Sequence, residues 1–248
     1  MFIPDFIPEL NEYKYILFNT KEGKPGRDYL LQRNISPETA KKWNLGFSPE
    51  DYDPLCYKGL LKENINYFWR KMNNRLIIPI FNSNNKLVSL SGRSINNRWP
   101  KYDHYPFPAK QILFGLNINK DNIRDEDYAI ITEGQLDVIS AWQNNLRTIT
   151  CSFGAHASQE HLALLGRYTR NIYIVYDNDK AGKKGTESLK YIKHADLNVN
   201  YCINMFKENE DLDNWIQSHT KEEFIYLLKN NYMLQLKEKL AKVKNNFS

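Results

Sequence analysis

Acidic residues follow two short apolar runs in the second half of the chain, and their spacing suits metal-dependent chemistry. The first run ends at Glu133, and Asp137 stands four residues further on. The second run ends at Asp177, with Asp179 two residues later. Carboxylates four apart share a face of a helix, and carboxylates two apart share a side of an extended chain. Each pair is therefore able to present two carboxylates in one direction.

We expect all four carboxylates to meet in one crevice, because ligands gather where the strands of a parallel sheet end. Two bare carboxylates ~4 Å apart repel each other by about 4 kcal/mol at an effective dielectric constant near 20, so such a cluster needs cations or protons. Ligation by oxygen alone favours Mg²⁺ or Mn²⁺ over zinc. The sequence therefore predicts a divalent metal site. The alternative is a set of solvated acids at strand ends.

The elements that must position these acids form an alternating pattern. Short apolar runs are typical of buried strands, and the stretches between them have helical spacing, so a parallel sheet is expected. We expect strands near 128–132, 147–152, 171–176 and 198–203, and helices over 135–144, 158–169 and 182–194. Ser158 is suited to cap the middle helix. The predicted fold class is α/β, with a Rossmann-like parallel sheet flanked by helices.

The first half of the chain predicts a separate α+β subdomain. Helices are expected over 10–19, 27–33 and 36–44, with Ser36 as an N-cap followed by Pro37 at the first helical position. Strands are expected over 75–81 and 86–91, joined by an Asn-rich turn. Pro79 has no amide proton, so the first of these is expected to be an edge strand.

The last part of the chain predicts a helical tail. Apolar residues recur at helical spacing from residue 224 to residue 243, which indicates one helix over 221–248 with a core-facing stripe. The expected division is therefore a basic α+β subdomain over 1–126, a parallel-sheet domain over 127–205, and an acidic loop with a helix over 206–248.

Charge and composition narrow the function classes. Residues 1–126 hold 19 Lys and Arg against 14 Asp and Glu, whereas residues 127–248 hold 15 of each kind. The first half is the natural candidate for a phosphate-rich partner. The three cysteines are far apart and lack metal-ligand spacing, so we expect reduced core thiols and no zinc site. No signal peptide, membrane span or Gly-x-x-x-x-Gly-Lys phosphate loop is expected, and a cytoplasmic location follows.

The joint acidic pattern resembles a known domain. Glu133-Gly134 with Asp137, followed by the Asp177-x-Asp179-x-Ala-Gly segment, is similar to the Toprim domain of DnaG-type primases, topoisomerases and some nucleases and repair proteins.

Motifs before this domain resemble the catalytic core of DnaG-type primases in particular. They are the Tyr29-Leu30-x-x-Arg33 segment, the strand that begins at Arg75, the Gly92-Arg93 and Lys101-Tyr102 pairs, and the Leu113–Leu116 segment. The resemblance covers about residues 27–220. One departure is that Asp103-His104 stands where the family has Asn-Ser, which could weaken or redirect a contact at Lys101.

The resemblance implies roles for the acids. The implied catalytic residues are Glu133, Asp177 and Asp179, and the implied ligands of two or more Mg²⁺ or Mn²⁺ ions are these three with Asp137, Asp211 and Asp213. Glu133 could instead act as a general base.

The resemblance also implies that cationic and polar groups hold phosphates of nucleotides and template. These residues are Asn74, Arg75, Arg93 and Lys101. Lys110 is a further candidate for a phosphate contact, and Lys180, beside the acids, is a candidate either to hold phosphate or to balance the acidic cluster. Arg in particular can fork onto two phosphate oxygens. For each residue the alternative is an ordinary solvated charge.

The function implied is that of a DNA primase core, which makes short RNA primers on a single-stranded DNA template from nucleoside triphosphates. A replicative helicase and a separate zinc-binding module are the further partners implied. Two alternatives stay open: a Toprim-family metal-dependent nuclease, and a non-catalytic nucleic-acid-binding module.

Overall fold

The computed structural model describes residues 6–50, 72–154, 157–177, 196–202, 205–206 and 211–231. The chain divides into two compact units, Met1–Pro108 and Ala109–Ser248. The sequence placed the first domain boundary at residue 126, whereas α5 (Leu116–Glu126) belongs to the second unit. The reason is that its apolar side chains pack into the core of that unit.

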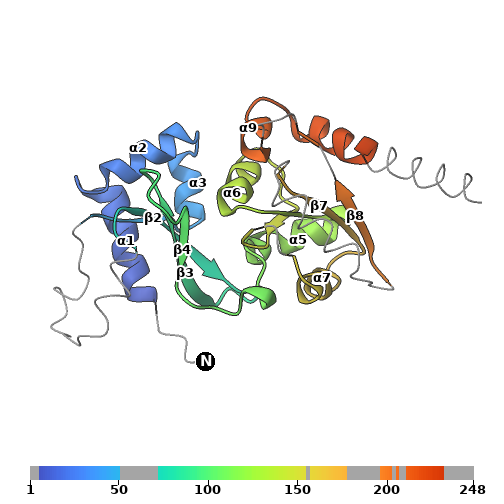
Figure 1. The fold of residues 1–248 in the computed structure, drawn as a ribbon, viewed down its shortest axis with the longest axis horizontal. Coiled ribbons are helices and arrows are strands. Elements are labelled where there is room, and N and C mark those ends of the chain that lie inside the picture. The colour runs from blue at the N-terminus through green and yellow to red at the C-terminus, as the bar shows by residue number, and fades with distance from the viewer. Residues whose placement is uncertain are drawn as a thin grey trace, which may run out of the picture. The chain divides into compact units, whose positions relative to one another are not determined.

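Three helices open the first unit: α1 (Ile7–Asn19), α2 (Lys24–Gln32) and α3 (Pro37–Lys42). They lie next to one another beside the sheet of this unit (Figure 1). All three were predicted, although α1 and α2 begin earlier than expected. The predicted N-cap of α3 is confirmed, because the Ser36 side chain accepts a hydrogen bond from the Thr39 amide.

The sheet of the first unit is antiparallel and has the strand order β1-β2-β3-β4. Its members are β1 (Gly46–Ser48), β2 (Arg75–Phe81), β3 (Leu87–Ser94) and β4 (Tyr102–His104). Tyr13 of α1 packs with Ile77 of β2 and Leu90 of β3 in an apolar cluster. This cluster joins the helices of the unit to its sheet.

The predicted hairpin is present, with two corrections. β3 continues through Gly92 and Arg93, beyond the end predicted at residue 91, because both residues pair with β2 on one side and β4 on the other. Pro79 predicted an edge strand, which is wrong for β2 as a whole because β2 lies between β1 and β3. The pairing of β1 with β2 ends at Ile77, and Pro79 is paired with Leu90 of β3.

The second unit is built on a parallel sheet with the strand order β6-β5-β7-β8. Its members are β5 (Ala129–Thr132), β6 (Ile149–Cys151), β7 (Asn171–Val175) and β8 (Asn198–Cys202). Each falls within a predicted strand, so the predicted α/β fold is confirmed. The strand order reverses between β5 and β7, which makes their carboxyl ends the topological switch point of the sheet.

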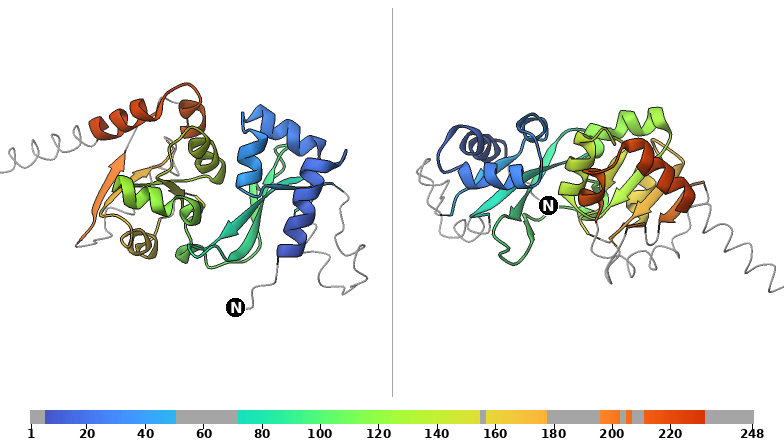
Figure 2. Two further views of the ribbon diagram at one scale, coloured as in Figure 1. Left: turned by 180° about the vertical axis from the view of Figure 1, so that it is seen from behind. Right: turned by 90° about the horizontal axis from the view of Figure 1, so that it is seen from above.

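Helices flank this sheet on two sides. α5 and α7 (Gln159–Leu165) lie on one side, and α6 (Gln135–Gln143) and α9 (Leu212–Ile216) lie on the other (Figures 1 and 2). The predicted cap of α7 is confirmed, because the Ser158 hydroxyl accepts a hydrogen bond from the His161 amide. The helix predicted over 182–194 lies outside the described residues.

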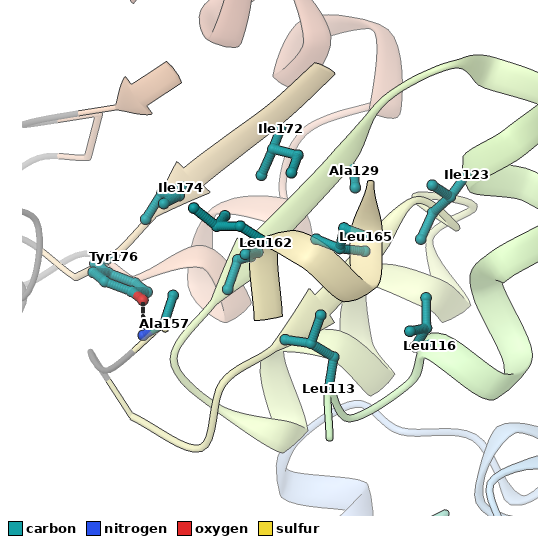
Figure 3. Packing of buried hydrophobic residues seen from close by; sticks show 11 residues of the cluster. Leu113, Leu116, Ile123, Ala129, Ala157, Leu162, Leu165, Ile172, Ile174 and Tyr176 are labelled. Atoms are coloured by element: carbon teal, nitrogen blue, oxygen red, sulfur yellow. Dashed lines mark hydrogen bonds between the residues drawn. The ribbon is translucent and has the colours of Figure 1, made fainter. Parts of the chain in front are cut away.

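Hydrophobic side chains fill the core between the sheet and α7, where the Tyr176 hydroxyl accepts a hydrogen bond from the Ala157 amide (Figure 3). Ala129 and Ile172 are paired across β5 and β7, and both are buried against Leu162 and Leu165 of α7. Full burial of a Leu or Ile side chain contributes about 1.5–3 kcal/mol. Ile130 alternates with Ala129 and is also fully buried, so both faces of β5 are covered. This core fixes the ends of β5 and β7, which carry the acids.

The described part of the predicted tail is helical over residues 221–231. Phe224 and Leu228 are buried, which confirms the apolar stripe over this length. Lys221 forms a salt bridge with Glu126 and so connects this helix to α5 within the second unit. In the part of the chain that the structure describes, no helix combines the length and apolarity that crossing a bilayer requires.

Candidate functional site

Glu133 and Asp177 meet at the switch point of the parallel sheet. Glu133 follows the last residue of β5, and Asp177 stands two residues after the end of β7. The two strands are neighbours, with Ile131 opposite Ile174. The Asp177 amide donates a hydrogen bond to Glu133 Oε1 at 3.0 Å. The first acid is therefore fixed directly against the backbone of the second.

A tight turn after β6 supports the same edge of the sheet. The Gly154 amide donates a hydrogen bond to the Glu133 carbonyl at 2.8 Å, and the Ser152 amide donates one to the Thr132 carbonyl at 3.3 Å. Phe153 and Gly154 have φ angles of 59° and 118°, and the second of these suits only glycine. The turn thus holds the backbone of Glu133 from the side opposite Asp177.

Asp137 lies in the first turn of α6, and it is the acid whose proton affinity the fold changes most clearly. Its Oδ2 accepts a hydrogen bond from the Gly134 amide at 3.0 Å. A Cβ atom on Gly134 would lie 2.6 Å from that oxygen, so any larger residue here would displace the Asp137 carboxylate. Burial is the largest cause that raises the pKa of Asp137 from 3.8 to about 7, followed by the charges of Asp177, Asp213 and Asp211.

Asp211 and Asp213 come from α9, which packs against α6. The sequence predicted an acidic loop here, but Asp211 is the N-cap of a helix and accepts a hydrogen bond from the Asn214 amide at 2.8 Å. Asp213 is only 2% exposed, and its Oδ1 accepts a hydrogen bond from Gln217 Nε2 at 2.9 Å. Asp213 is therefore a buried carboxylate in a helix and does not lie in a loop.

The charges of Asp177, Asp211 and Asp213 thus all act on Asp137, and Glu133 is bonded to the Asp177 backbone. Their oxygens are the ligand type that Mg²⁺ and Mn²⁺ prefer, so the chemistry of the donor set fits such ions. Among the described residues, no three His, Cys, Asp or Glu side chains form a group that could hold one metal ion. The predicted ligand Asp179 and the neighbouring Lys180 lie outside the described residues.

Arg75, a predicted phosphate ligand, is buried inside the first unit. Its exposed fraction is 2%, and its Nη1 donates to the carbonyls of Gly92 at 3.0 Å and Pro100 at 2.9 Å. A Cβ atom on Gly92 would lie 2.7 Å from Arg75 Cδ, so the side chain occupies space that glycine leaves open. Burial lowers the pKa of Arg75, and the charge of Asp103 opposes that effect. These contacts give Arg75 a structural role in holding the segment before β4.

Arg93, another predicted phosphate ligand, is 6% exposed. Its Nε donates a hydrogen bond to the Tyr29 hydroxyl at 2.9 Å, and its guanidinium carbon lies 4.9 Å from the centre of the Tyr102 ring. The two tyrosines therefore fix the plane of the guanidinium group. The sequence marked both tyrosines as motif positions, but it gave no signal that they hold this arginine.

The predicted phosphate-binding lysines differ from the arginines in exposure. Lys101 and Lys110 are both exposed, in the first and the second unit respectively. Asn74 is half-buried, has a φ angle of 55° and donates its amide to the Pro49 carbonyl at 3.3 Å. Of the described residues in this predicted set, only the two lysines present a charge fully to solvent.

Comparison with known proteins gives two matches in succession along the chain. A family described as DNA primase catalytic core, N-terminal domain, matches residues 13–120. A family described as Toprim-like matches residues 130–216. The chain belongs to the DnaG-type primase family. The primase of Staphylococcus epidermidis is 32% identical to it over 86% of this chain and 39% of that protein. This primase core thus spans about two fifths of the length of that relative.

Solved primase structures share the fold of this primase core. A DNA primase domain from Pseudomonas aeruginosa superposes with a TM-score of 0.78 at 25% identity, over 90% of this chain and 76% of that one. A DnaG primase catalytic domain bound to single-stranded DNA gives a TM-score of 0.76 at 23% identity, over 90% and 78% of the two chains. The likeness to the DNA-bound domain shows a shared fold.

Proposed function

We propose that this chain is a primase catalytic core that makes short RNA primers on single-stranded DNA by metal-dependent nucleotidyl transfer. The observation that carries the proposal is the convergence of carboxylates at the switch point of the parallel sheet. Glu133 accepts a hydrogen bond from the Asp177 amide, and the charges of Asp177, Asp211 and Asp213 all act on Asp137. Membership of the primase family supports the choice of reaction.

In the proposed reaction a 3′-hydroxyl attacks the α-phosphorus of a nucleoside triphosphate, and the bond to pyrophosphate breaks. Bound Mg²⁺ or Mn²⁺ would supply Lewis-acid charge to the attacking and leaving oxygens. Glu133, Asp137, Asp177, Asp211 and Asp213 would hold these ions, together with Asp179.

The described contacts specify what the chain itself contributes. The Asp177 amide and the turn after β6 fix Glu133 at the strand end, so little reorganisation is needed when a ligand arrives. Whether Glu133 binds an ion or accepts the proton of the attacking hydroxyl, this fixed position serves either role. Lys101 and Lys110 offer exposed ammonium groups to phosphates, each on its own unit.

The partners in this proposal are a single-stranded DNA template and ribonucleoside triphosphates. A related catalytic domain was solved with single-stranded DNA, which supports the choice of template. We propose a replicative helicase and a separate zinc-binding module as further partners.

The test is synthesis from labelled ribonucleotides on short single-stranded templates of varied sequence, with Mg²⁺. We expect primers from the wild-type chain and a loss of about 100-fold or more in Asp177→Asn, because the charge that holds the ion is removed. Asp125→Asn, on the exposed side of α5, is the matched control and should leave the rate unchanged. A circular dichroism spectrum and a melting curve should show that both variants are folded.

Two results would replace the proposal. Template fragments that form without added nucleotides would indicate a nuclease that uses the same acids. Template binding that is indifferent to Mg²⁺, with no product of either kind, would indicate a non-catalytic binding module.

A further inference from the structure

Trp99 is the most exposed of the large hydrophobic side chains that the structure describes, with 86% of its surface accessible. It stands in the loop of residues 95–101 between β3 and β4 in the first unit. An indole combines a large apolar surface with two flat faces, and a ligand that covers this surface removes it from water, which favours binding. The motifs that point to a primase leave Trp99 without a role.

The loop that carries Trp99 is anchored at both ends. The Ser94 amide donates a hydrogen bond to the Lys101 carbonyl at 3.0 Å, which closes the loop. Asn96 Oδ1 accepts hydrogen bonds from the Ser94 hydroxyl at 3.2 Å and the Arg98 amide at 3.4 Å. The residue after Trp99 is held by the buried guanidinium of Arg75, through the Pro100 carbonyl. Ordering this loop on a ligand therefore costs little conformational entropy.

The surroundings of the exposed ring are polar and cationic. Arg98 and Lys101 are exposed beside it, and residues 94–102 contain no Asp or Glu. Asn96 and Asn97 are exposed as well, whereas Ile95 and Pro100, the other apolar residues of the loop, are half-buried. A membrane or an apolar peptide needs a contiguous apolar patch, which this loop does not offer. A single flat ring between two cations instead suits a ligand with aromatic faces and phosphates, as in single-stranded nucleic acid.

We propose that Trp99 stacks on a base of the single-stranded DNA template, while Arg98 and Lys101 contact the phosphates that flank this base. The inference rests on the proposed function, which makes single-stranded DNA the template, and it adds a positioning residue for that strand. Stacking is tolerant of sequence because every base has a π-face. Trp99 therefore holds a template nucleotide without selecting which base it is.

The experiment is fluorescence anisotropy with a labelled oligodeoxythymidylate, without nucleoside triphosphates or Mg²⁺, at several salt concentrations. Trp99→Ala should raise the dissociation constant by roughly 5- to 150-fold, the range expected for one lost base–aromatic stack. Trp99→Phe should recover most of the affinity. The slope of affinity against salt should be the same for wild type and Trp99→Ala, because no phosphate contact is removed.

An oligonucleotide with abasic residues provides the decisive arm, because wild type and Trp99→Ala should bind it equally. Tyr15→Ala, at a 62% exposed ring on α1, is the matched control and should bind like wild type. Equal binding of the thymidylate by wild type and Trp99→Ala would overturn the inference. So would an equal loss on the abasic strand, no binding of the thymidylate by the wild-type chain, or binding of wild type to anionic vesicles alone.

Failure of this inference is distinguishable from failure of the proposed function. If the chain makes primers and Trp99→Ala binds template normally, only the stacking role fails. If stacking is observed but no primers form, the proposed reaction fails and the binding role of Trp99 stands.

Discussion

Asp137→Asn in the metal-free protein should stabilise the fold at high pH, because it removes a buried negative charge from a cluster of negative charges. The asparagine Oδ1 can still accept the hydrogen bond from the Gly134 amide, so the first turn of α6 keeps its cap. The substitution therefore changes the charge of the site with little change in its shape.

The magnitude follows from the pKa of Asp137, which burial and neighbouring aspartates raise from 3.8 to about 7. A tenfold change in proton affinity corresponds to about 1.4 kcal/mol, so the full difference would be about 4 kcal/mol. Because the residue is only half-buried, solvent screens part of it, and about 2 kcal/mol is the expected cost.

The sign follows from proton linkage. A carboxyl group with a raised pKa in the folded state does not lower the free energy of unfolding at low pH, where it is protonated in both the folded and the unfolded state. The cost develops as pH rises from about 4 to about 7, where the unfolded chain ionises first. The gain in stability from Asp137→Asn should thus grow from about 1 kcal/mol or less at pH 5 to about 2 kcal/mol at pH 8.

The assay is urea denaturation with EDTA at pH 5 and pH 8, repeated at pH 8 with Mg²⁺. Asp125→Asn is the control for a change of net charge. Mg²⁺ should stabilise the wild type more than Asp137→Asn, because the variant has lost a ligand. If Asp137→Asn instead destabilises the protein equally at both pH values, the repulsion inferred from the structure is absent.

Two glycine substitutions test close contacts within the units: Gly92 with Arg75 in the first, and Gly134 with Asp137 in the second. Gly92→Ala should lower the free energy of unfolding by about 1–3 kcal/mol, because its Cβ would lie 2.7 Å from Arg75 Cδ; urea denaturation measures this, and an unchanged midpoint would contradict it. Gly134→Ala should reduce the rate of primer synthesis, because the new Cβ would lie 2.6 Å from Asp137 Oδ2 and displace that carboxylate. A Gly134→Ala variant with the normal rate and the normal Mg²⁺ dependence would contradict the assigned geometry.

The parallel sheet was predictable because its signal is local. β5 and β7 contain short apolar runs, and β8 alternates polar and apolar residues, so the length and local pattern of each segment are enough to indicate a strand. The caps of α3 and α7 were predictable for the same reason, since Ser36 and Ser158 bond amides three residues further on. The meeting of Glu133 with Asp177 followed from the rule that ligands gather at parallel strand ends, and the hydrogen bond between them is consistent with it.

The burial of Arg75 and Arg93 was not predictable, because it depends on partners far away in the sequence. Arg75 donates to Pro100, 25 residues later, and Arg93 donates to Tyr29, 64 residues earlier. From its sequence alone, an arginine is expected to be a surface charge or a ligand. The fold shows that these two arginines instead hold other parts of the first unit in place through buried hydrogen bonds. The predicted end of this strand at residue 91 was wrong likewise, because pairing with β4 extends β3 through Arg93.

Asp213 shows the same limit on the acidic side. Its acid-rich surroundings predicted a loop, whereas Asp213 lies in α9, and packing of α9 against α6 accompanies its burial. The helix has only five residues, so its own sequence carries little helical signal and tertiary contacts decide.

The most direct test of the central claim is a titration of Mn²⁺ into the wild-type chain and into Asp177→Asn, with free Mn²⁺ measured by electron paramagnetic resonance. The account predicts saturable binding in the wild type that is lost or strongly weakened in Asp177→Asn and competed by Mg²⁺. Mn²⁺ binding that is absent from the folded wild-type chain, or identical in both proteins, would contradict it.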